Sequence, residues 1–423
     1  MDFLLKTKTA LLADEMGLGK SYQAIKASKN MRTLIIAPKA THKQWRNYII
    51  EFNKEATIIT GTKPQRIKQY IENSTQYTII NPEKILFDHH EIYFLAKKCD
   101  CLIIDEAQRI KNANAQRSQK IKTLKGPKYR WALTGTPMEN RVEELYSILE
   151  FLDPKIIDEF MNGCFYFGRK RSQLSMFKER FSRIHRILDK YMLRRVFADC
   201  PELPKATYNN YYVSLEGTQL EKYREFETEA QVYVQNNQFN ILGALARITR
   251  LRQCANSLQL FHPLSTESSK IDELLMIVDG LGEKVVIFSE FKKMCDIIID
   301  NLSGYTISYI HGGTKNVEVE KKRNWDVMVC TKSGEEGLNL QQAHHVINFE
   351  LPWNPARMTQ RTGRCRRIGQ SDPVNVINLI GDGTIDERIL NTIYHKQRLF
   401  DETIGIHDEE VTMNRTTIRG LIG

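Results

Sequence analysis

The chain has 423 residues, 41% hydrophobic and 26% charged, so it can build a sizeable core and is expected to divide into two or three domains. No apolar run reaches the length of a membrane span and the first residues lack a signal peptide's charge order, so we expect a soluble intracellular protein rather than a membrane or secreted one. Eight scattered cysteines predict reduced thiols, and a net charge of +10 suits a polyanion partner.

Residues 11–21 form an apolar run that breaks into a glycine-spaced loop and ends in Lys-Ser before a helical pattern. Such a loop can surround a phosphate with backbone N–H groups, with a lysine for the β- and γ-phosphates and a hydroxyl for Mg²⁺. The predicted nucleotide cradle comprises Asp14, Met16, Gly17, Leu18, Gly19, Lys20 and Ser21. Asp14 stands where the strict P-loop has glycine, which favours a helicase-type loop. A glycine-rich turn without a ligand is the alternative.

Strand patterns at 33–37, 77–80, 101–104 and 130–133 alternate with helical patterns, one of them at 42–52. This alternation predicts an α/β fold with a doubly wound parallel sheet. Ligands of such a sheet gather at the carboxyl ends of its strands. Four candidate residues fall at those ends: Lys20, Lys39, Asp105 and Thr134.

Two adjacent acids, Asp105 and Glu106, end the apolar strand at 102–104. Carboxylates at the end of a buried strand are costly unless a cation or hydrogen-bond donors await them. We therefore expect Asp105 to hold Mg²⁺ through water and Glu106 to orient or deprotonate the attacking water. A plain helix N-cap is the other interpretation of this pair.

From 139 to 195 the strand pattern stops and amphipathic helices are predicted, at 142–152 and 177–193. Residues 155–195 are basic and include Arg169, Lys170 and Arg171, which indicates either a nucleic-acid contact or a solvated helical face. Two prolines within 200–205 predict a linker. The expected domains are 1–200, with a helical elaboration at about 139–195, and 201–423, with a helical insertion at about 215–260 and a C-terminal helix.

The second half repeats the α/β pattern, with strands at 285–289, 306–311, 327–331, 346–349 and 374–380. Residues 331–340 form a polar strand exit that could contact phosphates. If residues 360–370 are helical, Arg364 and Arg367 lie three residues apart on one face and reach together toward a γ-phosphate. Arginines in that position accelerate hydrolysis by on the order of 10³–10⁵. Alternatively, they bind only nucleic acid or acidic side chains.

Together these stretches resemble the Swi/Snf-type DNA translocases of helicase superfamily two. Residues 14–21 are similar to motif I, 35–38 with Gln44 and Trp45 to motif Ia, 105–108 to motif II, and 133–137 with Asn140 to motif III. Residues 193–195 with 202–204 resemble the inter-lobe signature, and 251–253 the segment leading into lobe two. Residues 337–340 with 353–355 match motif V, and Gln360, Gly363, Arg364, Arg367, Gly369 and Gln370 match motif VI.

The resemblance implies two RecA-like lobes that use ATP and Mg²⁺, with Gly337 and Gln360 added to the nucleotide site. It also implies a DNA path near Lys39, Thr134, Lys332, Asn339 and Trp353, to which Arg169, Lys170 and Arg171 could add duplex contacts. A monomer that contacts mostly the DNA backbone is expected, in the cytoplasm of a bacterium or a phage-infected host. The family's upstream glutamine motif, which reads adenine, is absent from this sequence.

Three functions follow as hypotheses. The first is an ATP-dependent translocase on double-stranded or branched DNA that remodels forks or junctions, or displaces bound protein. The second is a strand-separating DNA or RNA helicase. The third, a nucleic-acid-binding module with a decayed ATPase, is disfavoured because Lys20, Asp105, Glu106, Arg364 and Arg367 are all present.

Overall fold

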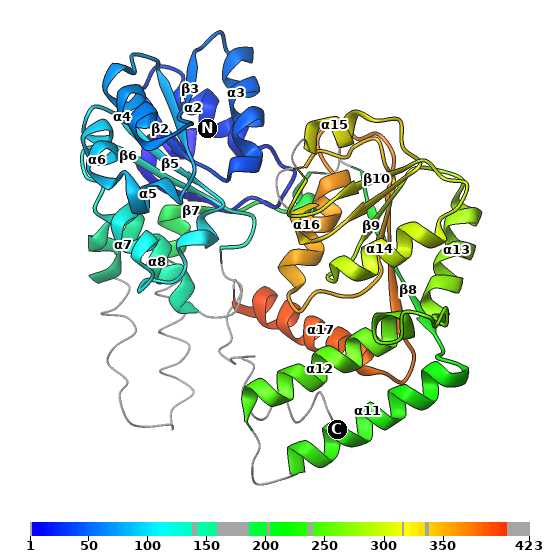
Figure 1. Ribbon diagram of the computed structural model, residues 1–423. Coiled ribbons are helices and arrows are strands. Elements are labelled where there is room, and N and C mark those ends of the chain that lie inside the picture. The colour runs from blue at the N-terminus through cyan, green and yellow to red at the C-terminus, as the bar shows by residue number, and fades with distance from the viewer. Residues whose placement is uncertain are drawn as a thin grey trace. The chain divides into compact units, whose positions relative to one another are not determined.

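The computed structural model describes residues 2–137, 142–158, 186–200, 204–235, 240–314, 317–334 and 338–403. The chain divides into two compact units, Met1–Pro201 and Glu202–Gly423 (Figure 1). The sequence prediction put this division between residues 200 and 201. Each unit is built around its own parallel sheet.

The described part of the first unit holds a seven-stranded sheet in the order β3-β4-β2-β5-β6-β1-β7, with every pair parallel. Its strands are β1 (Thr9–Leu12), β2 (Thr33–Ile36), β3 (Ala56–Ile58), β4 (Tyr77–Ile80), β5 (Cys101–Asp105), β6 (Tyr129–Leu133) and β7 (Met192–Leu193). Its helices are α1 (Asp2–Thr7), α2 (Lys20–Ser28), α3 (His42–Glu51), α4 (Lys63–Glu72), α5 (Lys84–Phe87), α6 (His89–Lys97), α7 (Gln116–Lys122) and α8 (Val142–Leu152).

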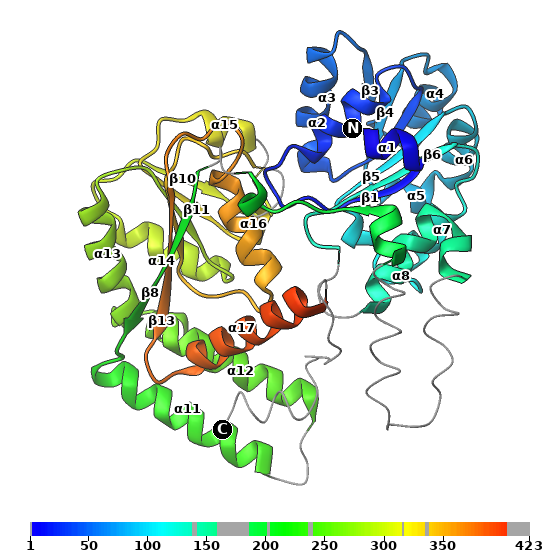
Figure 2. The ribbon, with the colours of Figure 1, turned by 180° about the vertical axis from the view of Figure 1, so that it is seen from behind.

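Helices cover both faces of this sheet, as Figures 1 and 2 show. Side chains alternate between the two faces of a strand. Thus Leu34 and Ile36 of β2 pack in the core formed with α4 to α8, whereas Ile35 packs in the core formed with α1 to α3. The strands therefore read as continuous apolar runs, which is why the sequence identified most of them.

The second unit contains, among its described residues, a six-stranded parallel sheet in the order β10-β11-β9-β12-β13-β8. Its strands are β8 (Ala206–Val213), β9 (Val285–Phe288), β10 (Ile307–Ile310), β11 (Val327–Cys330), β12 (His345–Asn348) and β13 (Val374–Gly381). Its helices are α11 (Gly217–Gln235), α12 (Ile241–Asn256), α13 (Ser269–Leu281), α14 (Lys292–Asn301), α15 (Val317–Lys322), α16 (Pro355–Cys365) and α17 (Ile385–Thr403).

A separate hydrophobic core joins the helices α11, α12 and α17, which lie together in both views (Figures 1 and 2). Tyr223 and Phe226 of α11, Leu251 of α12 and Ile389 of α17 are buried in it. The sheet of the second unit thus carries an additional helical layer, built from the predicted insertion at 215–260 and the predicted C-terminal helix.

One predicted element needs correction. The helix expected at 177–193 does not continue to its end, because Met192–Leu193 is the strand β7, paired in parallel with Leu11 and Leu12 of β1. A two-residue strand is too short to show an alternating pattern, so its apolar residues fitted the helical pattern before them. The remainder of that expected helix up to residue 185 lies outside the described residues.

The cysteines of the described residues are all free thiols, and six of these seven are buried. Burial raises the pKa of several of them, as for Cys99 and Cys365, to about 12, so they are inert packing residues. No helix in the described ranges is both long and apolar enough to cross a lipid bilayer.

Candidate nucleotide and nucleic-acid site

Residues 14–21, here called the phosphate loop, connect the buried strand β1 to α2 in the first unit. Gly17 and Gly19 have φ angles of 96° and 71°, a left-handed conformation that side chains rarely adopt. Lys20 opens α2, so the free N–H groups of the first helical turn and the positive end of the helix dipole lie at the loop. This is the local geometry of a phosphate-binding turn.

The Lys20 ammonium folds back over its own loop, where Nζ donates to the carbonyl oxygens of Asp14 at 2.7 Å and Glu15 at 3.3 Å. The loop that follows β6 closes against it. A Cβ on Gly135 would lie 2.5 Å from Cγ of Met16 and 3.5 Å from Lys20 Nζ, so only glycine allows this approach. The predicted motif III segment therefore packs directly on the phosphate loop.

Asp105 and Glu106 lie at the carboxyl end of β5, and the sheet register aligns Asp105 with Leu133 of β6 and thereby with Leu12 of β1. The acids and the phosphate loop consequently share one edge of the sheet. Asp105 is buried, and its Oδ2 accepts a hydrogen bond of 2.8 Å from the indole of Trp45. Burial and the neighbouring Glu106 charge raise the pKa of Asp105 to about 6.

Glu106 has a φ of 53°, which is unusual for a residue with a side chain and marks local strain at this position. Its Oε2 accepts from Gln108 Nε2 at 2.7 Å, and Thr134 donates to Gln108 Oε1 at 2.7 Å. The Thr134 hydroxyl also accepts the backbone N–H of Thr136 at 3.0 Å. These contacts form a continuous chain from the acid after β5 to the loop after β6.

Thr134 was expected at the DNA path, but its side chain is fully buried and its hydroxyl serves the chain to Glu106. The strand-end position was predicted correctly, whereas the direction of the side chain depends on the packing of the β5 and β6 loops. Asp14 was expected at the nucleotide. Its carbonyl contacts Lys20, while its carboxylate binds Arg195. Met16 and Leu18 are buried, and Ser21 is partly exposed in the first turn of α2.

The shared face expected for Arg364 and Arg367 required residues 360–370 to be helical, and in the second unit the helix α16 ends at Cys365. Arg366 adopts an extended conformation and donates through Nε to the Pro204 carbonyl at 2.8 Å. Gln341 holds the following turn through the Ile368 carbonyl. Arg364 and Arg367 therefore do not share a helix face, because tertiary contacts stop the helix between them.

The two arginines also differ in burial. Arg364 is 1% exposed and donates to the carbonyls of Leu338 and Gln360, each at 3.2 Å. Arg367 is partly exposed and donates through Nε to the Gly363 carbonyl at 2.8 Å. Gln360 itself is buried in α16.

Sequence reasoning missed Arg361, which is fully buried in the same helix. Its guanidinium donates to Asn348 Oδ1 at 2.9 Å, to the Glu350 carbonyl at 3.0 Å and to Glu290 Oε1 at 2.5 Å. Although burial acts to raise the pKa of Glu290, Arg361 and Arg357 hold that pKa below its usual range. The four-residue spacing of Arg357 and Arg361 was the available signal, since it places both on one helix face.

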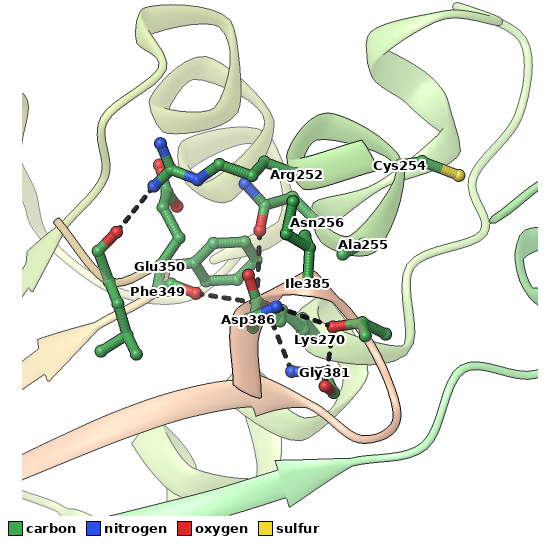
Figure 3. Close-up of polar contacts among 12 residues, drawn as sticks. Arg252, Cys254, Ala255, Asn256, Lys270, Phe349, Glu350, Gly381, Ile385 and Asp386 are labelled. Atoms are coloured by element: carbon green, nitrogen blue, oxygen red, sulfur yellow. Dashed lines mark hydrogen bonds and ion pairs between the residues drawn. The ribbon is translucent and has the colours of Figure 1, made fainter. Parts of the chain in front are cut away.

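A second buried polar network, also missed, joins α12, α13 and α17 (Figure 3). Lys270 of α13 is fully buried and forms an ion pair with Asp386 of α17. The Lys270 ammonium also donates to Asn256 Oδ1 at 3.3 Å and to the Phe349 carbonyl at 3.4 Å. This network fixes the helical layer to the end of β12.

The predicted DNA contacts occupy varied positions. Lys39 and Lys332 are exposed at the starts of short 3₁₀ turns after β2 and β11. Asn339 is partly buried, and the ring of Trp353 packs on the helical core, 5.1 Å from the Arg252 guanidinium. Arg169, Lys170, Arg171, Gly337 and Asn140 lie outside the described residues.

The described ranges contain no cluster of three acidic, histidine or cysteine side chains able to hold a metal by itself. The residues of the first unit fit Mg²⁺ carried with nucleotide phosphates, because Ser21 supplies a hydroxyl and Asp105 a buried carboxylate that a cation would stabilise. Such sites bind Mg²⁺ through few protein groups.

Comparisons with known proteins match two family models to this chain. The SNF2-related domain matches residues 3–260, and the helicase conserved C-terminal domain matches residues 268–369. The chain is 30% identical to the mouse (Mus musculus) SWI/SNF-related matrix-associated actin-dependent regulator of chromatin subfamily A member 1 over 437 residues, which cover 92% of this chain and 41% of that protein. It is 25% identical to the uncharacterized ATP-dependent helicase YqhH of Bacillus subtilis, covering 95% of this chain and 77% of that protein.

Among solved structures, the Sulfolobus solfataricus SWI2/SNF2 ATPase core in complex with dsDNA is 25% identical, with 95% of this chain and 90% of that chain covered and a TM-score of 0.41. The chain spans about two fifths of the length of the first curated relatives it matches.

Proposed function

This chain belongs to the SNF2-related family, and on that premise we propose that it is an ATP-driven translocase on double-stranded DNA that remodels branched structures. ATP-dependent helicases are among its relatives. The observation that carries the proposal is the gathering of Lys20, Asp105 and Glu106 at one sheet edge of the first unit. That set supplies the parts needed for phosphoryl transfer to water.

The roles follow from the contacts. The phosphate loop binds the nucleotide phosphates through its N–H groups and Lys20, and Ser21 and Asp105 would hold Mg²⁺, which neutralises phosphate charge when bound. Gln108 donates a hydrogen bond to Oε2 of Glu106, so we assign the other carboxylate oxygen of Glu106 to the attacking water. Arg367, partly exposed in the second unit, is assigned to the γ-phosphate, and Arg364 supports it from within the unit.

DNA is proposed to contact the basic side chains Lys39 and Lys332, together with Asn339 and Trp353, through its backbone. Phosphate contacts suit a motor, because they carry no sequence information and repeat along the track. The segment containing Arg169, Lys170 and Arg171 is proposed to add duplex contacts.

Branched DNA is the proposed substrate because migration of a junction replaces each broken base pair by an equivalent new one. That exchange is nearly neutral in pairing energy, as in other strand-exchange reactions. A motor that unwinds poorly can therefore still move a fork or a four-way junction. Displacement of bound protein is a second outcome of the same motion.

The test compares ATP hydrolysis and strand products on a mobile four-way junction, an immobile junction and a tailed duplex. We expect ATP-dependent products from the mobile junction only. Efficient unwinding of the tailed duplex without action on the mobile junction would reject junction remodelling and favour a strand-separating helicase. ATP hydrolysis unaffected by any DNA would reject the motor itself.

Two variants connect this activity to the site. Lys20→Ala should lose nucleotide binding and turnover, whereas Glu106→Gln should bind ATP and hydrolyse it about 10²–10⁴-fold more slowly, because only the base is lost. Nucleotide titration and steady-state hydrolysis measure the two effects. Normal hydrolysis by Glu106→Gln would remove Glu106 from its proposed role.

A further inference from the structure

The aspartate that replaces the first glycine of the P-loop pattern is held by the end of the first unit. The Asp14 carboxylate is 0% exposed and accepts four hydrogen bonds. Arg195 supplies three of them, from Nε to Oδ1 at 3.0 Å, from Nη2 to Oδ2, and from its backbone N–H to Oδ1 at 3.1 Å. Gln23 of α2 supplies the fourth, from Nε2 to Oδ2 at 3.0 Å.

Arg195 belongs to residues 192–200, here called the exit segment, which precede the end of the unit at Pro201. Backbone hydrogen bonds interleave this segment with the phosphate loop. The Ala13 N–H donates to the Leu193 carbonyl at 2.7 Å, and the Glu15 N–H donates to the Arg195 carbonyl at 2.8 Å. The exit segment therefore runs alongside the end of β1 and the start of the phosphate loop.

Asp14 links Arg195 of the exit segment to Lys20 of the phosphate loop. Its side chain binds Arg195, and its carbonyl oxygen accepts from the Lys20 ammonium at 2.7 Å. Arg195 also donates to Gln23 Oε1 at 2.5 Å, and Gln23 in turn donates to the Leu18 carbonyl at 2.9 Å. Arg195 thus contacts the start of the loop directly and the middle of the loop through Gln23.

The exposure of the two partners is unequal. The Arg195 side chain is 42% exposed, so water can solvate it. The buried Asp14 carboxylate needs hydrogen-bond donors from the protein instead. Burying a carboxylate at this position costs free energy, whereas a glycine would pack there without a charge. The buried charge is explained if the bidentate hydrogen bonds from Arg195 set the shape of the phosphate loop. The loop needs this support because its two left-handed glycines leave its shape free to vary.

We propose that Arg195 is a positioning residue for ATP binding: by holding Asp14 it keeps the phosphate loop in its binding shape and links nucleotide binding to the exit segment. The proposal rests on the assignment of residues 14–21 as the phosphate loop. Coupling of this kind is reciprocal, so bound nucleotide must also stabilise the exit segment on the loop. The exit segment leads to the second unit, which makes it a route for reporting nucleotide occupancy.

The first unit offers a matched control. Arg66 and Asp88 form an equally bidentate pair, at 2.5 and 2.7 Å, and Asp88 is also 0% exposed and receives a third donor from Tyr70 at 3.1 Å. This pair joins α4 to the start of α6 and touches no predicted nucleotide residue. Breaking it tests the general cost of losing a buried ion pair in this unit.

The test measures affinity for a fluorescent ATP analogue in the full chain. Arg195→Ala should weaken binding by about tenfold or more through misplacement of the loop, and millimolar guanidinium should restore part of it, since the site is open to solvent. Arg66→Ala should unfold more easily but keep its affinity, with or without guanidinium. Asp14→Asn, which removes the buried charge and is less prone to misfold, should also weaken binding.

Hydrogen exchange of the exit segment gives the second readout. Bound nucleotide should slow exchange of its amides in the unmodified chain and have less effect in Asp14→Asn. Unchanged affinity in both Arg195→Ala and Asp14→Asn would overturn the proposal, as would equal losses in Arg195→Ala and Arg66→Ala. If Lys20→Ala also binds the analogue normally, the phosphate-loop assignment fails instead.

Discussion

Asp105 shows what a single residue contributes to the site. Its carboxyl group is held by the Trp45 indole and the Glu106 N–H, and burial together with the Glu106 charge raises its pKa to about 6 from 3.8. Between these two values the folded protein keeps a proton that the unfolded chain releases, so the free energy of unfolding falls as pH rises. Above the folded pKa the full cost of the buried charge is present.

We therefore predict that Asp105→Asn, whose side chain cannot ionise, changes the free energy of unfolding of the metal-free protein more favourably at neutral pH than at about pH 4. The difference between the two changes should be on the order of 2–3 kcal/mol. Urea unfolding of both proteins at the two pH values measures this difference. Equal effects at the two values would show that folding does not raise the pKa of Asp105. The same variant should lose ATP hydrolysis, because the proposed Mg²⁺ ligand is gone.

At the scale of elements, α16 ends between two arginines that were expected to act together. Arg364 satisfies the carbonyls of Leu338 and Gln360 inside the unit, whereas Arg367 is partly exposed beyond the helix. We predict that Arg364→Ala lowers the free energy of unfolding by about 1–3 kcal/mol, since buried carbonyls lose their donor. Arg367→Ala should change it little.

Both variants should lose ATP turnover, so urea unfolding and hydrolysis must be measured on the same preparations. A stable Arg364→Ala protein with normal turnover would contradict both the structural and the catalytic assignment. Hydrolysis at the normal rate by Arg367→Ala would by itself remove the second unit's arginine from the reaction.

The buried ion pair between Lys270 and Asp386 also belongs to the scale of elements, because it connects α13 to α17 (Figure 3). Removing one charge leaves the other buried without compensation, so Lys270→Met should cost about 3–5 kcal/mol of unfolding free energy. Adding Asp386→Asn should recover part of that loss, because asparagine can still accept the hydrogen bond of 3.1 Å that the Gly381 N–H donates to Asp386 Oδ2. Additive effects in this double-mutant cycle, measured by urea unfolding, would show that the two residues are not coupled.

At the scale of the whole molecule, the net charge of +10 favours a polyanion. Neutralised phosphates release counterions, so we predict that duplex affinity falls by about 10³–10⁵ between roughly 50 and 200 mM salt if six to ten phosphates are contacted. Lys39→Gln and Lys332→Gln should each reduce the salt slope by about one. Lys68→Gln, which alters an exposed lysine on α4 paired with Glu72, serves as the control and should leave the slope unchanged. A flat salt profile would argue against backbone tracking.

The sequence by itself determined the features whose cause is local. The apolar runs of β2, β4, β5 and β9 specify buried parallel strands, and glycine spacing with Lys-Ser specifies the turn before α2. The two adjacent acids at the end of β5 indicated a cation and a water without any knowledge of the fold. The ordered motifs then predicted the family that the comparisons support.

Only the tertiary structure decided which side chains meet. Trp45 contacts Asp105 from sixty positions away and Arg195 contacts Asp14 across 181, separations at which no periodic pattern carries information. The short strand β7 exists because β1 offers it an unpaired edge, and α16 ends at Cys365 because Gln341 and Pro204 hold the turn beyond it. Such contacts depend on chain segments brought together by the sheets, so local propensity could not foresee them.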